Sequence, residues 1–212
     1  MKSIDVLKWR YATKKFDSSE YLSEDKINIL KEAFNLTPTS YGLQPLRLLV
    51  IKDKILQEKL KVASYNQQQV HSASHVLVIC IETNLNEQFI KNNFDLVKKI
   101  RNTPDEVLTP YQNFLIDNFS KRTSEQVEQW ATNQAYLVLG NLLTICAYEE
   151  IDACPMEGFV SEQYTEILNL NQQNLRPVLV LPVGKRAKDD MFADFKKVRR
   201  PLEEMVIDVT NN

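Results

Sequence analysis

The stretch TSEQVEQWATNQAYLVLGNLLTICAY, residues 123–148, predicts the longest helix of the chain. Thr123 followed by Gln126 fits a capping box, in which the glutamine side chain returns to the backbone amide of the threonine. From residue 135 onward the stretch is apolar on nearly every side, which is typical of a helix buried on more than one face. In a chain of 212 residues, a second subunit could supply one of the covering surfaces as readily as the chain's own core.

Helix and strand patterns alternate around this stretch. Ser23 predicts the N-cap of a helix that ends near Asn35, and Asp53 predicts the start of another. Surface helices that would cover a site are expected between about residues 84 and 122, and Ser161 is expected to cap a later helix. Apolar runs predict strands at residues 46–51, 75–81, 151–154 and 178–181. Strands separated by helices predict an α/β or α+β domain.

The composition excludes several kinds of site. The chain has four glycines, which are too far apart for a Rossmann dinucleotide turn or a P-loop: Gly42, Gly140, Gly158 and Gly184. Side chains must therefore hold any phosphate group. The two histidines and three cysteines form neither H-E-x-x-H nor C-x-x-C, so no metal site is expected.

Charge and hydropathy predict a single cytoplasmic domain over residues 1–212. The 26 basic and 28 acidic residues give a net charge of −2, which offers no general attraction to nucleic acids or acidic membranes. The odd number of cysteines predicts buried reduced thiols rather than disulfides. No apolar signal segment or membrane-spanning stretch is found in the sequence.

The segment Arg10 to Phe16 carries the first candidate binding group. Arg10 and Lys14 are four residues apart, so a helical turn would place both cations on one side, where they could hold a phosphate. Near the C-terminus, residues 196–201 supply further cations. Taken alone, each charge run is more often a solvated helix end or tail.

Three loops carry uncharged candidate groups. Residues 38–45 offer hydroxyls to a polyol, and residues 65–70 offer carboxamides that can read an imide edge. In residues 155–159, Gly158 permits a backbone to approach a flat ligand closely. Each loop, taken alone, is more often a plain connection or turn.

Taken together, these segments resemble the FMN-dependent nitroreductase family, most closely its oxygen-insensitive NAD(P)H nitroreductase and dihydropteridine reductase branch. The resemblance covers nearly the whole chain. The matching pieces occur in family order at residues 10–16, 38–40 with 44–45, 66 with 73–75, 130–134, 155–159 and 197–199. The whole set in order is a much stronger signal than any one piece.

The resemblance implies an α+β fold, with a mixed β-sheet wrapped by helices, and an intertwined homodimer that binds two FMN molecules at the subunit interface. It implies that Arg10, Lys197 and Arg199 bind the FMN phosphate. Lys14 would face the ribityl chain and the N1/O2 side of the ring, where it would stabilise the anionic reduced flavin.

The resemblance also assigns the ring contacts. Asn66 would read the pyrimidine edge, and the backbone amides of Glu157 and Gly158 would meet N5 and O4. Pro155 and Met156 would pack against the ring. The other subunit would contribute Pro38, Thr39 and Ser40. The remaining cofactor residues in the matching segments are Tyr11, Ala12, Gln69 and Gln134.

Three residues differ from the family pattern. Ala12 stands where the family often has serine, so one hydroxyl contact to the phosphate is missing. Gln69 stands where close relatives have a lysine, which bears on the charge near O2 and on coenzyme choice. Gly42 replaces a polar residue beside Tyr41 in the substrate loop, and Phe114 and Phe119 are candidates for the family's aromatic gate.

The implied reaction is a ping-pong hydride relay. NADH or NADPH would give a hydride to flavin N5 and leave, and a nitroaromatic, a quinone or a similar small planar acceptor would then take two electrons. Two alternatives stay open: a flavin-storage or flavin-sensing module without turnover, and a structural or nucleic-acid-binding protein that uses the basic residues 185–200.

Overall fold

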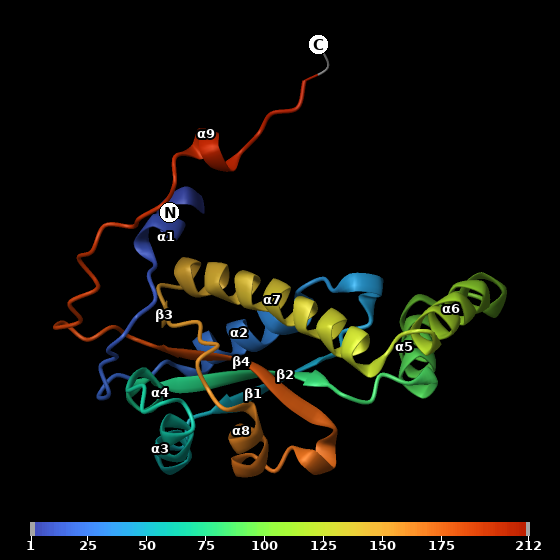
Figure 1. Ribbon diagram of the computed structural model, residues 1–212, viewed down its shortest axis with the longest axis horizontal. Coiled ribbons are helices and arrows are strands. Elements are labelled where there is room, and N and C mark those ends of the chain that lie inside the picture. The colour runs from blue at the N-terminus through green and yellow to red at the C-terminus, as the bar shows by residue number, and fades with distance from the viewer. Residues whose placement is uncertain (1–2, 211–212) are drawn as a thin grey trace.

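A four-stranded antiparallel sheet in the order β1-β2-β4-β3 forms the centre of the molecule (Figure 1). The computed structural model describes residues 3–210. Its strands are β1 Leu46–Ile51, β2 His75–Glu82, β3 Asp152–Ala153 and β4 Leu175–Gly184. Its helices are α1 Ser3–Trp9, α2 Glu24–Leu36, α3 Lys54–Val62, α4 Gln69–Ser72, α5 Glu87–Arg101, α6 Asp105–Ser120, α7 Ser124–Tyr148, α8 Ser161–Ile167 and α9 Leu202–Met205. Short 3-10 turns lie at Ser40–Gly42 and Asn171–Gln173.

The α+β class is confirmed, but the expected mixed pairing is not found in residues 3–210. Every pair of neighbouring strands there is antiparallel, and the single parallel pairing is an isolated bridge between Ala12 and Ala153. Segment 10–16 is too irregular to extend that bridge into a strand. The strand β1 is left at one edge of the sheet, with β2 as its neighbour.

Strand β2 is covered on both faces, as its continuous apolar run predicted. Leu77, Ile79 and Ile81 pack in one core cluster with residues of α2 and α7. The alternate residues Val76 and Val78 pack in a second cluster with residues of α3 and α8. Because successive strand side chains point to opposite faces, the sheet separates two helical layers (Figure 1).

Helix α7 begins and ends where the sequence predicted, and both hydrogen bonds of the capping box are present. Its inner face, which includes Ala135 and Leu142, is fully buried in the core. On its outer face, Tyr136 is 44 % exposed and Leu137 is 55 % exposed. The single chain therefore buries one side of this apolar helix and leaves another side uncovered.

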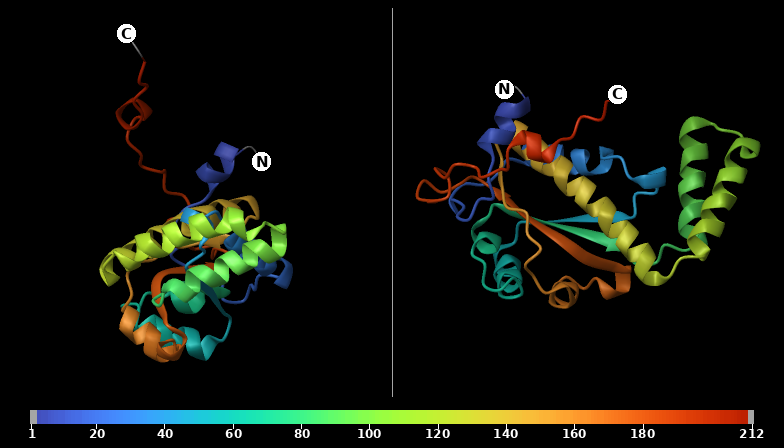
Figure 2. Two further views of the ribbon diagram at one scale, coloured as in Figure 1. Left: turned by 90° about the vertical axis from the view of Figure 1, so that its right-hand side faces the viewer. Right: turned by 45° about the horizontal axis from the view of Figure 1, so that its top comes forward.

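Helices α5 and α6 form a hairpin that projects from the body beside the start of α7 (Figure 2). Asn102 ends α5 in the left-handed conformation, with φ 53°, which asparagine tolerates better than most residues. A third core cluster, formed by Leu43 with Phe94, Leu115 and Phe119, packs the inner side of the hairpin. Surface helices in this region were predicted from the sequence.

Two of the other predicted helix caps are confirmed and one is wrong. Ser23 accepts a hydrogen bond from Lys26 N, and Asp53 accepts one from Leu56 N. Ser161 is the first residue of α8 rather than its cap, and its hydroxyl donates to the carbonyl of Pro177 at 2.7 Å. The hydroxyl is thus directed toward strand β4, and α8 begins at Ser161 without a side-chain cap.

The C-terminal segment from Lys185 to Thr210 lies outside the sheet layers, near α1 (Figure 1). It is largely exposed although it carries many apolar side chains: Val198, Leu202, Met205, Val206, Ile207 and Val209. All three cysteines of the chain are buried and unpaired, as predicted. Within residues 3–210, the helices are too short or too polar to cross a bilayer.

Candidate functional site

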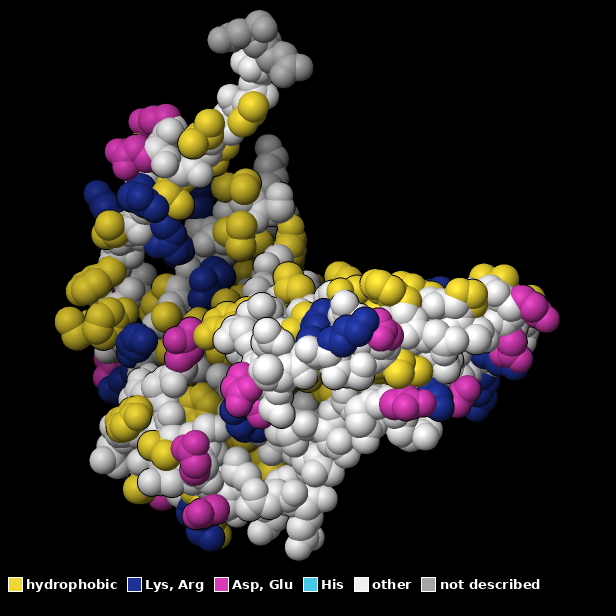
Figure 3. Space-filling view, turned by 45° about the vertical axis from the view of Figure 1, so that its right-hand side comes forward, with side chains coloured by type: hydrophobic (Ala, Val, Ile, Leu, Met, Phe, Trp, Pro, Cys, Tyr) yellow, Lys and Arg dark blue, Asp and Glu magenta, His cyan; other side chains and the backbone are white. Residues whose placement is uncertain are grey.

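A cavity of about 390 Å³ lies where the N-terminal and C-terminal segments meet. This volume falls in the range of small-molecule sites. Figure 3 shows lysine and arginine side chains gathered among hydrophobic ones beneath the C-terminal tail. The described residues that line the cavity include five cations and no carboxylate: Arg10, Tyr11, Ala12, Lys14, Pro155, Phe192, Phe195, Lys196, Lys197 and Arg199. Seven of these ten were predicted cofactor residues.

The N-terminal wall of the cavity is extended rather than helical. Helix α1 ends at Trp9, and Thr13 N donates to the carbonyl of Ala153 at 3.2 Å. The expectation that Arg10 and Lys14 share a helical turn is therefore wrong, because pairing with β3 holds the segment open. Both side chains still line the same cavity.

The cations at one end of the cavity lack a counter-charge. Burial lowers the pKa of the Arg10 guanidinium, and the charge of Arg199 adds to this effect. Burial also lowers the pKa of the Lys197 ammonium, with further contributions from Arg10 and Arg199. Within residues 3–210 none of these three forms an ion pair, and Lys197 Nζ donates to a neutral carbonyl, that of Lys8, at 2.7 Å. An anion held between them would relieve both desolvation and mutual repulsion.

Lys14 links the cavity to the centre of the protein. Its Nζ lies 3.7 Å from Cys154 Sγ, at the end of β3. Burial raises the pKa of the Cys154 thiol, and hydrogen bonds from Lys14 and Gln69 oppose that rise. Gln69 is itself only 6 % exposed, and its Nε2 donates to Gln67 Oε1 at 3.0 Å.

The loop at residues 65–70 contacts the segment at 155–159, as a shared site requires. Gln67 Nε2 donates to the carbonyl of Gly158 at 2.8 Å. A Cβ on Gly158 would lie 3.0 Å from that nitrogen, so glycine permits the close approach. Asn66 is exposed, in the left-handed conformation with φ 58°.

Met156 and Glu157 point in different directions from this segment. Met156 is 5 % exposed and packs in the core, and its backbone pairs with Val180. Glu157 is exposed and accepts a hydrogen bond from Tyr136 Oη at 2.6 Å. Neither side chain lines the cavity, although Pro155 does.

A second group of predicted residues lies elsewhere in the chain. Ser40 N donates to Gln134 Oε1 at 2.8 Å. Tyr41, with φ 60°, packs on Trp130 and Phe119 at ring-centroid distances of 6.1 and 6.0 Å. None of these residues lines the cationic cavity, and the same is true of the rest of the group: Pro38, Thr39, Gly42 and Phe114.

Comparison with known proteins decides the family. Residues 7–185 match the family model described as the nitroreductase family. The chain belongs to the nitroreductase family. The family is one of oxidoreductases, so the predicted enzyme class is confirmed together with the resemblance.

Relatives and solved structures agree with this assignment. A Staphylococcus haemolyticus protein provisionally named NAD(P)H nitroreductase is 31 % identical over 211 residues, which cover 96 % of this chain and 95 % of that protein. A provisionally named nitroreductase from Bacillus subtilis superposes with a TM-score of 0.87 at 22 % identity, covering 97 % and 98 % of the two chains. Another, from Exiguobacterium sibiricum in complex with FMN, superposes with a TM-score of 0.84 at 23 % identity, covering 98 % and 97 %.

The nitroreductase chain also holds residues at the site that sequence reasoning missed. Asp190 accepts hydrogen bonds from both walls of the cavity. Asp152, 5 % exposed, pairs with Arg186 at 2.6 Å, and Arg186 stacks over the rings of Trp9 and Tyr11. Asp152 lies between the apolar residues Ile151 and Ala153 of a predicted strand. A charged side chain at such a position needs a buried partner, so this pattern could have identified Asp152 from the sequence.

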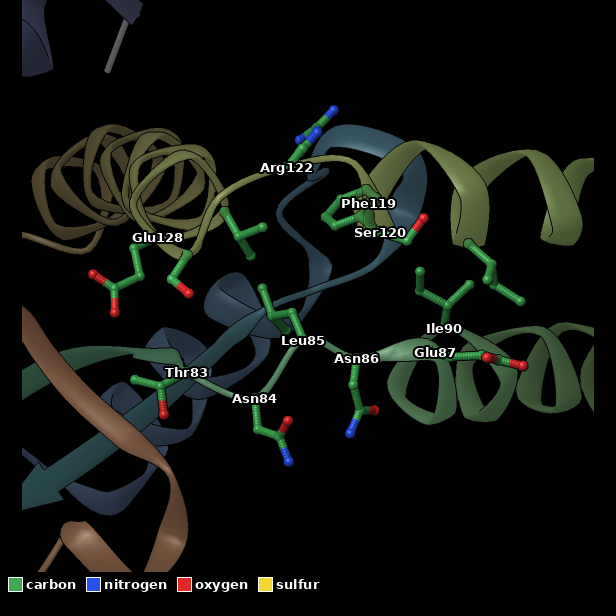
Figure 4. Close-up of a pocket in the computed structure, with 13 residues that line it drawn as sticks. Thr83, Asn84, Leu85, Asn86, Glu87, Ile90, Phe119, Ser120, Arg122 and Glu128 are labelled. Atoms are coloured by element: carbon green, nitrogen blue, oxygen red, sulfur yellow. The ribbon is translucent and has the colours of Figure 1, made fainter.

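Another cavity of this nitroreductase, of about 400 Å³, lies between the end of β2 and the ends of α5, α6 and α7 (Figure 4). It includes Phe119, whose ring lies 4.4 Å from the Arg122 guanidinium carbon. Phe119 is only 6 % exposed. Phe114 is 53 % exposed and stacks on Tyr111, so it is the better placed of the two gate candidates to move.

Proposed function

We propose that this nitroreductase is an FMN-dependent NAD(P)H oxidoreductase that reduces nitroaromatics, quinones or similar planar acceptors. The observation that carries the proposal is the cavity with five cationic lining residues and no carboxylate among its described residues. FMN in the Exiguobacterium sibiricum relative and the NAD(P)H in the name of the Staphylococcus haemolyticus relative support the same cofactors here.

The cationic end of the cavity fits a terminal phosphate. Arg10 and Arg199 would bind its oxygens with planar guanidinium groups, and Lys197 would add a point charge. The lowered pKa values of Arg10 and Lys197 fit a site that is completed by an anion. Ala12 offers no hydroxyl, so the cations would carry phosphate binding without that contact.

The isoalloxazine ring would extend from this end past Lys14 toward Gly158. The Lys14 ammonium would stabilise negative charge at N1 and O2, with Cys154 as its neighbour on the protein side. Gln67 holds the Gly158 backbone, whose amide would meet the ring edge with that of Glu157. Asn66 and Gln69 would face the pyrimidine side, and Pro155, supported by Met156, would pack on the ring.

When bound, FMN supplies the redox chemistry by taking a hydride from NADH or NADPH and passing it to the acceptor. The chain supplies orientation and charge. The cations would fix the phosphate, Lys14 would hold positive charge beside the pyrimidine, and Phe192 and Phe195 would provide apolar surface at the phosphate end. Tyr41, Gly42 and Phe114 would shape the pocket that selects the acceptor, and Phe119 would support them from the core.

We infer that the site is completed in a homodimer. Pro38, Thr39, Ser40 and Gln134 lie away from the cationic cavity of their own chain, and a second copy could present them to it. The uncovered apolar face of α7 supports such an interface. The exposed apolar tail and the free edge of β1 also fit a partner chain that wraps around the body.

Reconstitution with FMN tests the proposed function. The purified protein should bind FMN, show a flavin absorption band, and lose that band when NADH or NADPH is added without oxygen. A quinone or a nitroaromatic should restore the band. Tight FMN binding without NAD(P)H oxidation would instead indicate a storage or sensing module. A protein that binds no FMN but binds polyanions in a salt-sensitive way would defeat the proposal.

A further inference from the structure

Asp190 lies where the two walls of the cavity separate, and its carboxylate bonds to both. It is 4 % exposed. Its Oδ2 accepts hydrogen bonds from Tyr11 Oη at 2.9 Å, Lys14 N at 2.9 Å and Lys15 N at 3.2 Å. Its Oδ1 accepts one from Phe192 N at 3.2 Å. One carboxylate thus satisfies four donors from segments about 180 residues apart in sequence.

Before Asp190 in the sequence, the C-terminal segment is joined to the N-terminal segment by backbone hydrogen bonds. Asp17 N donates to the carbonyl of Lys185 at 2.8 Å, and Ala187 N donates to that of Lys15 at 2.9 Å. Beyond Ala187 the backbones diverge to form the two walls. The Asp190 side chain continues the connection there, because it binds the amides of Lys14 and Lys15 that face the C-terminal segment.

The residues tied by Asp190 line the cavity themselves. Tyr11 and Lys14 belong to the N-terminal wall, and Phe192 belongs to the C-terminal wall. Lys197 and Arg199 follow Phe192 along the chain, and Arg10 precedes Tyr11. The separation of the cations across the cavity therefore depends on how these two segments are held together.

The geometry points to Asp190 as a positioning residue for phosphate recognition, which sets the spacing between Arg10 on one wall and Lys197 and Arg199 on the other. The inference rests on the proposed FMN site. Asp190 does not touch the phosphate in this scheme; it holds Tyr11, Lys14 and Phe192, which lie on the same two walls as the cations that would bind it.

The hydrogen bonds of the Asp190 carboxylate and its negative charge have opposite expected effects on FMN affinity when Asp190 is replaced. The carboxylate is negative and lies beside a site for an anion, so its charge alone opposes phosphate binding. By charge, Asp190→Asn would tighten FMN binding. Loss of the hydrogen bonds that hold the two walls would weaken FMN binding. An amide has one acceptor oxygen, and its NH2 group would face N–H donors.

Flavin titrations of the full-length apoprotein separate these effects. FMN and riboflavin share the ring and the ribityl chain, but only FMN carries the phosphate. We expect Asp190→Asn to weaken FMN binding by about tenfold, as loss of a charge-assisted hydrogen bond would, and to weaken riboflavin binding by no more than about threefold, because Lys14 is the one residue held by Asp190 that would face the ring. The matched control is Asp189→Asn, which removes the same charge from the same turn, since Asp189 is exposed and pairs with Lys15. The control should bind FMN as the wild type does, or slightly more tightly.

Each other outcome overturns the inference in a recognisable way. Unchanged or tighter FMN binding by Asp190→Asn would show that charge dominates. Equal losses for FMN and riboflavin would show that Asp190 serves the fold alone. A wild type that binds both flavins equally would overturn the proposed phosphate site, and the inference with it.

A second variant keeps the inference testable if Asp190→Asn does not fold. Tyr11→Phe removes one of the four hydrogen bonds and leaves the carboxylate in place. It should weaken FMN binding by about threefold, as loss of a single hydrogen bond would, and riboflavin binding by less than that. No difference between the flavins in this variant would contradict the inference.

Discussion

Arg199 and Arg200 are neighbours of the same charge, but only Arg199 lines the cationic cavity. If Arg199 binds the FMN phosphate, Arg199→Ala should weaken FMN binding by about ten- to a hundredfold, the effect of losing a charge-assisted contact. Riboflavin binding should not change. Fluorescence titration of the apoprotein measures both, and Arg200→Ala is the matched control, which should retain wild-type affinity. Equal losses in the two variants would indicate a diffuse electrostatic effect instead.

The Asp190 carboxylate should also make stability depend on pH. Burial alone would raise its pKa, but hydrogen bonds from Lys14, Lys15, Tyr11 and Phe192 outweigh burial and lower it. A depressed pKa in the folded state stabilises the protein above the unfolded value of about 3.9, and the stabilisation is lost as pH falls through the folded value. Urea unfolding of wild type and Asp190→Asn should differ by about 2 kcal/mol near neutral pH.

That difference should begin to shrink once the pH falls below about 4, because the carboxylate is then protonated in the unfolded chain, and it should be lost as the pH falls through the lower folded pKa. Asp189→Asn should change unfolding much less, since Asp189 is exposed and its ion pair with Lys15 is screened by solvent. A difference between wild type and Asp190→Asn that stays constant down to the lowest pH would contradict the assignment.

The cationic residues that line the cavity were easier to predict than the residues that hold its walls in place. Arg10 and Arg199 were predicted through the resemblance to a family, because a charge run alone is more often solvated. Asp190 and Cys154 act through contacts with segments that are distant in sequence, and no local pattern reports such contacts. The cavity lining at Phe192 and Phe195 was missed for the same reason.

At the scale of elements, local signals predicted boundaries well where the chain itself decides them. The caps at Ser23, Asp53 and Thr123 bond to amides three residues away, so sequence spacing is sufficient. The predictions for Ser161 and for residues 10–14 were wrong because both segments bond to strands that local spacing does not reveal. The Ser161 hydroxyl donates to Pro177, and Ala12 pairs with Ala153. The antiparallel order of the sheet likewise depends on distant pairings.

The capping box of α7 gives a prediction about stability. Thr123→Ala removes the acceptor of Gln126 N at the start of a 25-residue helix and should lower the free energy of unfolding by about 1 kcal/mol. Ser124→Ala, at the next and equally exposed position, should change it by less than about 0.5 kcal/mol. Urea unfolding of the two variants at one protein concentration measures the difference, and equal effects would argue against the cap as the cause.

At the scale of the whole molecule, the uncovered face of α7 predicts an obligate partner. Leu137→Glu places a charge on that face and should convert a dimer into a monomer in light scattering coupled to size exclusion. FMN affinity should fall with it, because each site would lose the partner's residues. Ile55→Glu is the control, since Ile55 is 73 % exposed on α3, in the opposite helical layer.

A wild-type protein that is monomeric and still binds FMN tightly would contradict this model. Only the resemblance to a family predicted that residues 38–40 would reach the site from the other subunit. The structure places Arg10 and Ser40 in different parts of one chain, and a single chain gives no local sign of which groups meet across an interface.

The position of the cavity between residues 10–14 and 192–199 has a consequence for biosynthesis. Two of its five cations, Arg10 and Lys14, are translated more than 180 residues before the other three, Lys196, Lys197 and Arg199. A nascent chain still inside the ribosome therefore presents Arg10 without Lys197 or Arg199, and it cannot form the complete anion site. Under the proposed function, the cofactor would bind only after residues 196–199 have left the ribosome, so it would stabilise the folded chain without guiding the folding of the segments made earlier.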